Sequence, residues 1–327
     1  MNQPTMPTSQ QLAIGIDIGG TNSTFGLVDH RGEIKYRGAI STNKYDNVTD
    51  YIEALYDAVA PAIDQVGGTK LIHGMGIGAP NGNYYKGTIE YAPNLKWKGI
   101  IPFAELITEK FGLPCALTND ANAAAVGEMM YGAAKGMKDF IMITLGTGVG
   151  SGIVSNGQLV LGHDGFAGEL GHTIIIPGGR THWGTGMQGS LEAYCSATGV
   201  RLSAIEQLEK NTDTPSLMRD YPEKELDSRL VYECAQQGDT LANQVYAYTG
   251  EVLGKALANF VMFSSPEAII LFGGLCKAGD LLLKPTRKHM EENMLPIFQN
   301  KVKLIFSELK EADAAVLGAS ALVWEIK

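Results

Sequence analysis

One stretch, IGIDIGGTN (residues 14–22), decides the fold of this chain, and a second, IMITLGTGVGSGIV (residues 141–154), follows the same plan. Each is an apolar run of the kind that forms a buried strand, followed by a glycine-rich turn and a further strand. Glycine at the turn removes Cβ, so a phosphate can approach the main-chain N–H groups, and the hydroxyls of Thr21 and Thr147 add donors. A single turn of this form is weak evidence, because most are only hairpins. Two of them predict a duplicated fold that holds a polyphosphate from both sides.

The composition is typical of a soluble globular protein. The 327 residues are 45% hydrophobic and 19% charged, with a net charge of −9. An acidic chain argues against nucleic acid as the main partner, and no apolar run reaches the roughly 18–20 residues that a membrane helix needs. Residues 1–11 are predicted to be a disordered leader without a signal-peptide pattern. The four cysteines are scattered and form no CxxC pair, which indicates reduced thiols in a cytoplasmic protein.

Strand and helix patterns alternate along both halves of the chain. In the first half we expect strands at 12–29 (a hairpin), 33–39, 70–78 and 115–118, and helices at 48–66, 101–111 and 121–131. In the second half we expect a hairpin at 140–155, a strand at 158–161, mainly helix from 189 to 263, a buried strand at 268–274 and a last helix at 313–324. The charged segment 207–228 is predicted to be a surface turn region.

Because strands and helices alternate in both halves of the chain, we expect an α/β fold of two domains with a cleft between them. We expect a small N-terminal α/β domain at 12–120, joined by the C-terminal helix 313–327, and a large C-terminal α/β domain at 121–312.

Four motifs in a fixed order support a more specific interpretation. They are DIGGT (17–21), NDANAAA (119–125), GTGVG (146–150) and GELGH (168–172). Together they resemble the ROK family of repressors, open reading frames and sugar kinases, within the actin-like ATPase superfamily. The resemblance runs from about residue 12 to the C-terminus. It implies two ribonuclease-H-like domains that close on a sugar in an active-site cleft, and an ATP-dependent hexose kinase, most often one for glucose.

The resemblance assigns the chemistry to two aspartates. Asp120 is the implied catalytic base, which accepts the proton of the sugar 6-hydroxyl as that oxygen attacks the γ-phosphoryl group. Its plain alternative is a helix N-cap. Asp17 is expected near Mg²⁺ and the transferring phosphate, because Mg²⁺ prefers carboxylate, water and phosphate oxygens; a turn cap is its alternative. Many family members have lysine after the GGT, and Asn22 here removes that cationic contact.

By family position, six residues are expected to hold the sugar through their amide, carboxylate and imidazole groups. They are Asn94, Asn119, Asp120, Glu169, His172 and Glu192. Each taken alone could be a surface polar residue or a helix cap. The glycines at 168 and 171 permit a turn that places Glu169 and His172 on one wall.

Contacts with ATP are expected at both glycine turns and at a later strand end. The residues are Asp17, Gly19, Gly20, Thr21, Gly146, Thr147, Gly148, Gly273 and Gly274. The segment PEAIILFGGL (266–275) resembles the family's adenosine motif, although a buried strand followed by a turn would look the same. ATP and Mg²⁺ are the expected cofactors.

A structural zinc ion is not expected. Many family members carry Cys-x-Cys-Gly-x-x-Gly-Cys after the histidine of the GELGH motif, and these cysteines bind zinc together with that histidine. Here the three cysteine positions hold Trp183, Thr185 and Ser190. A zinc site needs about four N, S or O ligands. The loop is therefore expected to be ordered by packing of Trp183 and Met187, or by the sugar itself.

These residues bear on three functions. A hexose kinase uses every motif; a glucose kinase is expected, and the alternatives are fructokinase, N-acetylmannosamine kinase and other hexose or amino-sugar kinases. A repressor needs a helix-turn-helix domain before residue 17, for which few residues are present. A non-catalytic sugar-binding regulator has no need of Asp17, Asp120 and two phosphate turns. We therefore expect ATP and a hexose as partners, with neither nucleic acid nor membrane, and leave a homodimer open.

Overall fold

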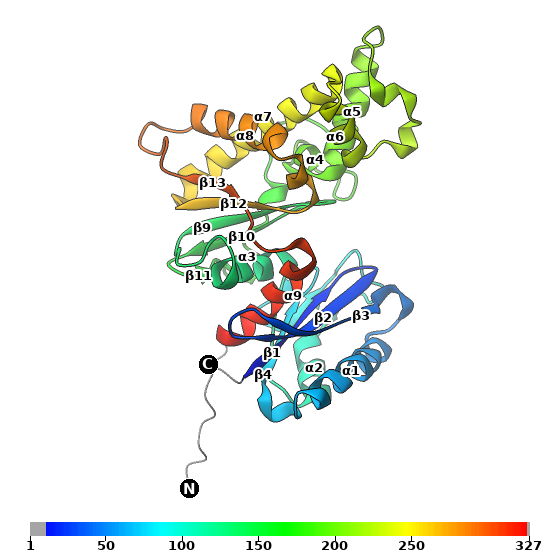
Figure 1. Cartoon of the computed structure of the whole chain (residues 1–327), viewed down its shortest axis with the longest axis vertical. Helices are drawn as coiled ribbons and strands as arrows, with labels where there is room; N and C mark the ends of the chain where they lie inside the picture. The colour runs from blue at the N-terminus through cyan, green and yellow to red at the C-terminus, as the bar shows by residue number, and fades with distance from the viewer. Residues whose placement is uncertain (1–10, 326–327) are drawn as a thin grey trace. The chain divides into compact units, whose positions relative to one another are not determined.

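The computed structural model describes residues 11–325, and its internal contacts divide the chain into two compact units (Figure 1). Unit 1 comprises Met1–Met137, Gly152–Gly168 and Glu308–Lys327, and unit 2 comprises Lys138–Ser151 and Glu169–Ser307. Residues 1–10 of the predicted leader lie outside the described residues. This division differs from the predicted boundaries at 120 and 312, because the segments 121–137 and 152–168 group with unit 1.

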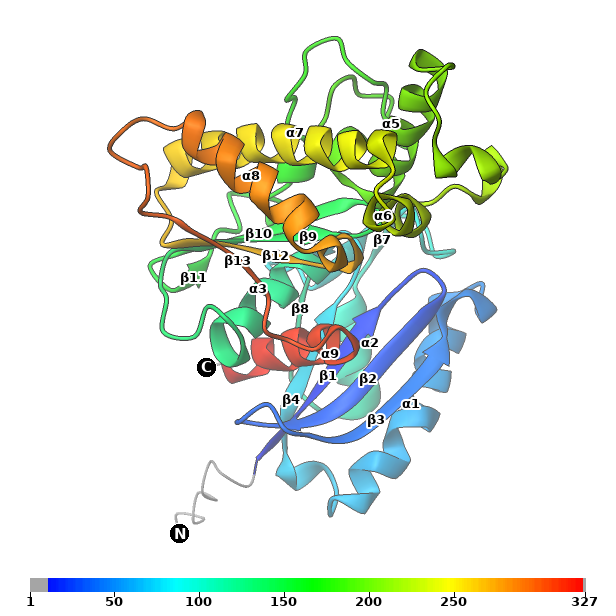
Figure 2. The same ribbon diagram turned by 45° about the horizontal axis from the view of Figure 1, so that its top comes forward.

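Unit 1 is built on a five-stranded sheet with the order β3-β2-β1-β4-β8 (Figure 2). Its strands are β1 (Leu12–Ile18), β2 (Asn22–Asp29), β3 (Ile34–Ser41), β4 (Ile72–Gly78) and β8 (Cys115–Thr118). The hairpin β1-β2 and the pair β2-β3 are antiparallel, whereas β1, β4 and β8 run parallel. The carboxyl ends of three neighbouring strands therefore meet at one edge, which is where ligands bind in open α/β sheets.

The two faces of this sheet are covered by different helices. Alternate residues of β1, from Leu12 to Ile18, enter the core that α1 (Val48–Gln65) and α2 (Phe103–Phe111) cover. The other face is flattened by glycine, so that α9 (Glu311–Ala321) lies directly on it. A Cβ at Gly15 would lie 2.1 Å from the carbonyl oxygen of Val316, and one at Gly76 would lie 1.9 Å from that of Ala319.

Helix α3 (Asp120–Tyr131) packs on α9 through a second glycine contact, since a Cβ at Gly127 would lie 2.8 Å from the Cα of Gly318. This contact explains why α3 groups with unit 1. A three-stranded sheet, β5 (Gly82–Asn83), β6 (Thr88–Glu90) and β7 (Ile100–Ile101), completes the regular structure of the unit.

The second five-stranded sheet has the order β11-β10-β9-β12-β13. Its strands are β9 (Phe140–Leu145), β10 (Val149–Ser155), β11 (Gln158–Leu159), β12 (Ala268–Phe272) and β13 (Lys303–Phe306), and β12 is parallel to both β9 and β13. The long helices α7 (Thr240–Ser264) and α8 (Asp280–Glu292) pack together on one side of β9, β12 and β13 in both ribbon views (Figures 1 and 2). Unit 2 also contains α4 (Glu192–Cys195), α5 (Ala197–Lys210) and α6 (Ser228–Gln236).

The predicted α/β class and most of the predicted elements are confirmed, but several elements were missed. The small sheet β5-β7, the strand β13 and the helix α8 were not predicted. The helix expected at 101–111 begins at Phe103, and the end of the last helix is a 3₁₀ turn, η8 (Leu322–Glu325). Strands of two or three residues carry no periodic pattern, which is why the sequence does not reveal them.

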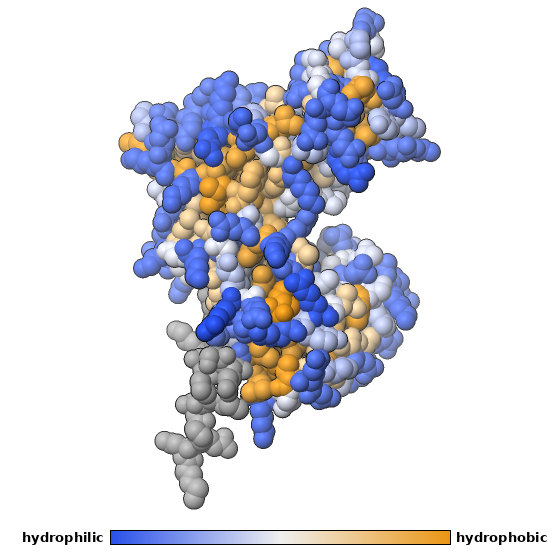
Figure 3. Space-filling view, viewed as in Figure 1, coloured by the Kyte–Doolittle hydropathy of each residue, from blue (hydrophilic) through white to orange (hydrophobic). Residues whose placement is uncertain are grey.

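The surface agrees with the expected exposure of segment 207–228. This segment holds the end of α5 and two 3₁₀ turns, η5 (Leu217–Asp220) and η6 (Glu223–Glu225), and the tip it forms in unit 2 is mostly hydrophilic (Figure 3). Among the residues that the structure describes, no helix is both long enough and apolar enough to span a bilayer.

Candidate active site

Two carboxylates meet at the edge of the unit 1 sheet where parallel strands end. Asp17 is the register partner of Gly78, and Gly78 is the partner of Thr118, two residues before Asp120. A Cβ at Gly78 would lie 3.6 Å from the Cα of Asp120 and 3.8 Å from Oδ1 of Asp17. The glycine at the end of β4 thus leaves the space in which the two acids face the same region.

Burial changes the acidity of both groups. Burial and, to a smaller extent, the nearby charge of Asp120 together raise the pKa of Asp17 from its ordinary value of 3.8 to about 6. Burial also raises the pKa of Asp120, although the N–H of Ala121, 2.8 Å from Oδ1, opposes this by favouring the carboxylate. Two neighbouring carboxyl groups of like charge fit a divalent cation, and a raised pKa suits a general base.

Asn119, rather than Asp120, caps helix α3. Its Oδ1 accepts a hydrogen bond from the N–H of Asn122 at 2.7 Å, and Asp120 is the first residue of the helix. The helix N-cap, which was the alternative role for Asp120, is thus supplied by Asn119. The side chain of Asp120 is left to accept a bond from the first-turn N–H of Ala121 and to face Asp17.

The first glycine turn lies against a predicted sugar ligand. The N–H of Gly19 donates to the carbonyl of Asn22 at 3.0 Å, which closes the turn between β1 and β2. A Cβ at Gly20 would lie 2.7 Å from the carbonyl oxygen of Asn94. The structure therefore brings Asn94 and Gly20 together within unit 1. The carbonyl of Thr21 accepts from the N–H of Thr42 at 2.8 Å, so the turn is fixed on its outer side.

The second glycine turn rests on Glu192. The N–H of Gly146 donates to the carbonyl of Gly148 at 3.0 Å, between β9 and β10. Oε2 of Glu192 accepts from the N–H of Val149 at 2.6 Å, and a Cβ at Gly148 would lie 2.5 Å from that oxygen. The phosphate turn and a predicted sugar ligand are thus joined by a direct hydrogen bond within unit 2.

Glu169 and His172 lie close together. Glu169 precedes the 3₁₀ turn η4 (Leu170–His172), of which His172 is the last residue, and 4.0 Å separates His172 Nε2 from Glu169 Oε2. The Nδ1 atom of His172 is buried and has no hydrogen-bond partner among the described residues.

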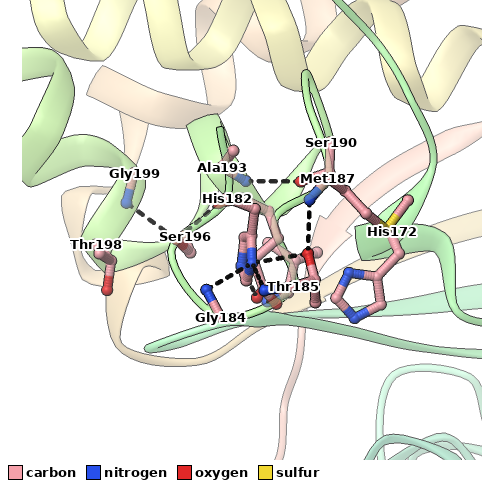
Figure 4. Close-up of polar contacts among 12 residues, drawn as sticks. His172, His182, Gly184, Thr185, Met187, Ser190, Ala193, Ser196, Thr198 and Gly199 are labelled. Atoms are coloured by element: carbon pink, nitrogen blue, oxygen red, sulfur yellow. Dashed lines mark hydrogen bonds and ion pairs between the residues drawn. The ribbon is translucent and has the colours of Figure 1, made fainter. Parts of the chain in front are cut away.

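The loop that follows shows a residue that the sequence did not single out as part of the site. His182 is buried, with 4% of its side chain exposed, and its Nε2 lies 2.6 Å from Oε1 of Glu192. Its Nδ1 receives the N–H groups of Gly184 and Thr185 at 3.1 and 3.0 Å (Figure 4).

The expected packing of Trp183 is met by the ring of His182, whose centroid lies 4.2 Å away, although Trp183 and Met187 remain 48% and 38% exposed. Hydrogen bonds to His182 hold the turn as well, and the alternative that the sugar orders this loop stays a prediction. No sequence pattern links His182 to Glu192, which lies ten residues further along the chain.

A cavity of about 610 Å³ in unit 2 adjoins the second glycine turn. Gly146 and Thr147 line one end, Gly274 and Leu275 line another, and Tyr232 and Tyr246 are among the remaining side chains. A Cβ at Gly274 or Gly146 would meet nothing within 4 Å. The predicted nucleotide residues Gly146, Thr147 and Gly274 thus share one cavity, whose volume is in the range of small-molecule sites. Gly273, at φ +107, makes the turn after β12.

The two sheets, each with a glycine turn after its first strand, define an α/β protein of the actin-like ATPase class to which sugar kinases belong. The chain belongs to the ROK family, whose model matches residues 13–326.

Its relatives include kinases and repressors. The chain is 36% identical to a glucokinase of Halalkalibacterium halodurans, over 96% of each chain. It is similar to the solved structure of a ROK family glucokinase from Streptomyces griseus in complex with glucose and AMPPNP, with a TM-score of 0.77 and 32% identity over 95% of this chain and 98% of that one. It is also 31% identical to a putative xylose repressor of Caldicellulosiruptor, over 95% of this chain and 78% of that protein.

Proposed function

We propose that this chain is an ATP-dependent glucokinase, which transfers the γ-phosphoryl group of ATP to the 6-hydroxyl of glucose. The observation that carries the proposal is the pair of carboxylates Asp17 and Asp120, which lie around Gly78 at the carboxyl ends of β1 and β8. The similarity to glucokinases over nearly the whole chain supports glucose as the acceptor.

Asp120 is the general base in this proposal. As O6 of glucose forms its bond to the γ-phosphorus, the bond from that phosphorus to the bridging oxygen of ADP breaks and the O6 proton passes to Asp120. The buried position of Asp120 raises its pKa, which brings it closer to the pH at which the reaction runs. ADP leaves with the electron pair of the broken bond.

Asp17 would hold Mg²⁺ together with the nucleotide, because it is a half-buried carboxylate whose neighbour is a second carboxylate. The bound cation would neutralise charge on the phosphates. Main-chain N–H groups of the turns 19–21 and 146–148 would receive the phosphates. The cavity beside Gly274 would receive the nucleoside.

The sugar would be held by Asn94, Asn119 and Asp120 of unit 1 and by Glu169, His172 and Glu192 of unit 2. Both oxygens of Glu192 already accept bonds from the protein, yet a carboxylate has about four acceptor positions and can bind sugar hydroxyls with the rest. We also propose a cytoplasmic location, supported by four cysteines that are all free.

A coupled assay of ADP release across a panel of sugars tests this function. The panel contains glucose, fructose, mannose, N-acetylmannosamine, N-acetylglucosamine and xylose, each with Mg²⁺ and ATP. Glucose should give the highest kcat/KM. Turnover of another sugar with glucose inert would replace glucose but keep the kinase. Sugar binding by calorimetry without turnover of any sugar would contradict the kinase.

A further inference from the structure

The side chains at 182–190 do not fit a zinc ion. The positions at which many members of this family carry zinc-binding cysteines hold Trp183, Thr185 and Ser190 here, and neither an indole nor a neutral hydroxyl is a usual zinc ligand. Oγ1 of Thr185 lies 3.1 Å from His182 Nδ1, and Ser190 Oγ accepts from the N–H of Ala193 at 3.4 Å. Within residues 11–325 no group of three His, Cys, Asp or Glu side chains could hold a metal.

The hydrogen bonds of His182 define its tautomer. The N–H groups of Gly184 and Thr185 both point at Nδ1, so this nitrogen is the unprotonated acceptor. The proton therefore sits on Nε2, which donates to Oε1 of Glu192 at 2.6 Å. A bond to a carboxylate is stronger than one between neutral groups, and more so where both side chains are buried. Glu192 is 14% exposed and His182 is 4% exposed.

We propose that His182 orders the turn 182–187 of this chain without a metal and fixes the carboxylate of Glu192 for the sugar. It is a positioning residue that acts through Glu192, and this part rests on the proposed function. The path runs from the N–H groups of the turn, through the imidazole, to Glu192 and on to the N–H of Val149 at the phosphate turn. The side chain of His182 thus connects the turn 182–187 to the proposed sugar ligand Glu192 and, through it, to the phosphate turn.

The base of this loop is anchored independently of His182. The guanidinium of Arg180 donates to the carbonyls of Ala193 and Gly199, and to Glu206, and it lies over the ring of Tyr194. Changes at His182 should therefore affect the tip of the loop and leave α4 and α5 folded. Trp183, whose ring centroid is 4.2 Å from that of His182, reports on the tip by its fluorescence.

Two substitutions separate the two functions of the imidazole. In His182→Asn the amide oxygen stands near the position of Nδ1, so the turn keeps an acceptor, while the donor to Glu192 is lost. In His182→Gln the amide N–H₂ reaches toward the position of Nε2, so the donor to Glu192 is kept while the acceptor is lost. His163→Gln, a change at an exposed histidine, is the matched control.

We expect His182→Asn to weaken glucose binding about 10–100-fold and to raise its KM, because one bond to a charged group is removed. KM for ATP should stay within about twofold. His182→Gln should bind glucose within about threefold of the unchanged protein. It should, however, speed hydrogen exchange at the amides of Gly184 and Thr185 and shift the Trp183 emission to longer wavelength. The control should change none of these.

Equal effects of both substitutions on glucose binding and on amide exchange would overturn the proposal, since they would indicate only a structural role. The proposal would also be overturned if neither substitution changed glucose binding or amide exchange. In the unchanged protein, EDTA should leave exchange at residues 184 and 185 as it was; faster exchange with release of zinc would show that a metal orders the turn. These exchange measurements do not depend on the kinase reaction, so they stand even if glucose proves not to be the substrate.

Discussion

Asp120 is the residue on which the proposed chemistry depends. Asp120→Asn keeps the size of the side chain and the cap supplied by Asn119, but it removes the base. We expect kcat to fall about 10²–10⁴-fold, with the dissociation constant for glucose changed much less. Steady-state kinetics and calorimetry of the same sample measure both. A variant that keeps more than about a third of the kcat would refute the assignment.

Asp17 should make the stability of the ligand-free protein depend on pH. Its pKa is about 6 in the folded chain and near 3.8 when the chain unfolds, so the folded state holds the proton more tightly. The stabilisation is complete below pH 4 and is lost as pH rises through 6. The loss is ~3 kcal/mol at most.

Asp17→Asn removes both the carboxyl group that lowers stability as pH rises and the proposed metal ligand. The variant should be more stable than the unchanged protein at pH 8 and similar to it at pH 4, and it should lack kinase activity. Urea unfolding at several pH values, without Mg²⁺ or nucleotide, measures the difference. A difference that stays constant from pH 4 to pH 8 would contradict the pKa of Asp17.

At the scale of elements, α9 can lie on β1 and β4 only because those strands carry glycine. Gly76→Val should lower the free energy of unfolding by 1–3 kcal/mol or more, since even a Cβ would lie 1.9 Å from the carbonyl of Ala319. KM for ATP should not change in the fraction that folds. Unfolding by denaturant measures the first effect, and an unaltered midpoint would show that α9 does not contact the sheet as described.

Gly274→Val is the matched substitution at the nucleotide cavity. A Cβ at Gly274 would meet nothing within 4 Å, and the residue lines the cavity of about 610 Å³. We therefore expect an unchanged midpoint of unfolding and a KM for ATP raised by about tenfold, with KM for glucose unchanged. If glucose affinity fell and ATP affinity did not, the cavity would not be the nucleotide site.

At the scale of the whole molecule, the proposed ligands are divided between two units that the chain connects at 137–138, 151–152, 168–169 and 307–308. A sugar that binds the folded chain and not the unfolded one stabilises it by mass action. We therefore expect glucose to raise the melting temperature, and at a hundredfold excess over Kd the stabilisation is about 2.7 kcal/mol. An unchanged melting temperature with glucose at millimolar concentration would contradict the assignment of the sugar ligands.

Much of the fold follows from local sequence pattern. The strands β1, β4 and β12 consist mainly of apolar residues and glycine, and glycines form the turns after β1 and β9. These signals depend on neighbours in the chain, so the α/β class and both turns could be predicted from them. The motifs of the ROK family added Asp17 and Asp120, because they are read in order along the sequence.

The sequence by itself therefore determined the class of the fold, the two turns and the acids beside them. Only the tertiary structure decided that Gly78 separates Asp17 from Asp120, that α3 joins unit 1, and that His182 bonds to Glu192. The last contact needs the chain to reverse between His182 and Met187, where the N–H of Gly186 donates to the carbonyl of His182 at 3.0 Å and Gly186 has a φ of +72. The periodicity of apolar residues indicates which side chains of a local segment are buried. It does not indicate which of these side chains will form a hydrogen bond with each other after the chain reverses its direction.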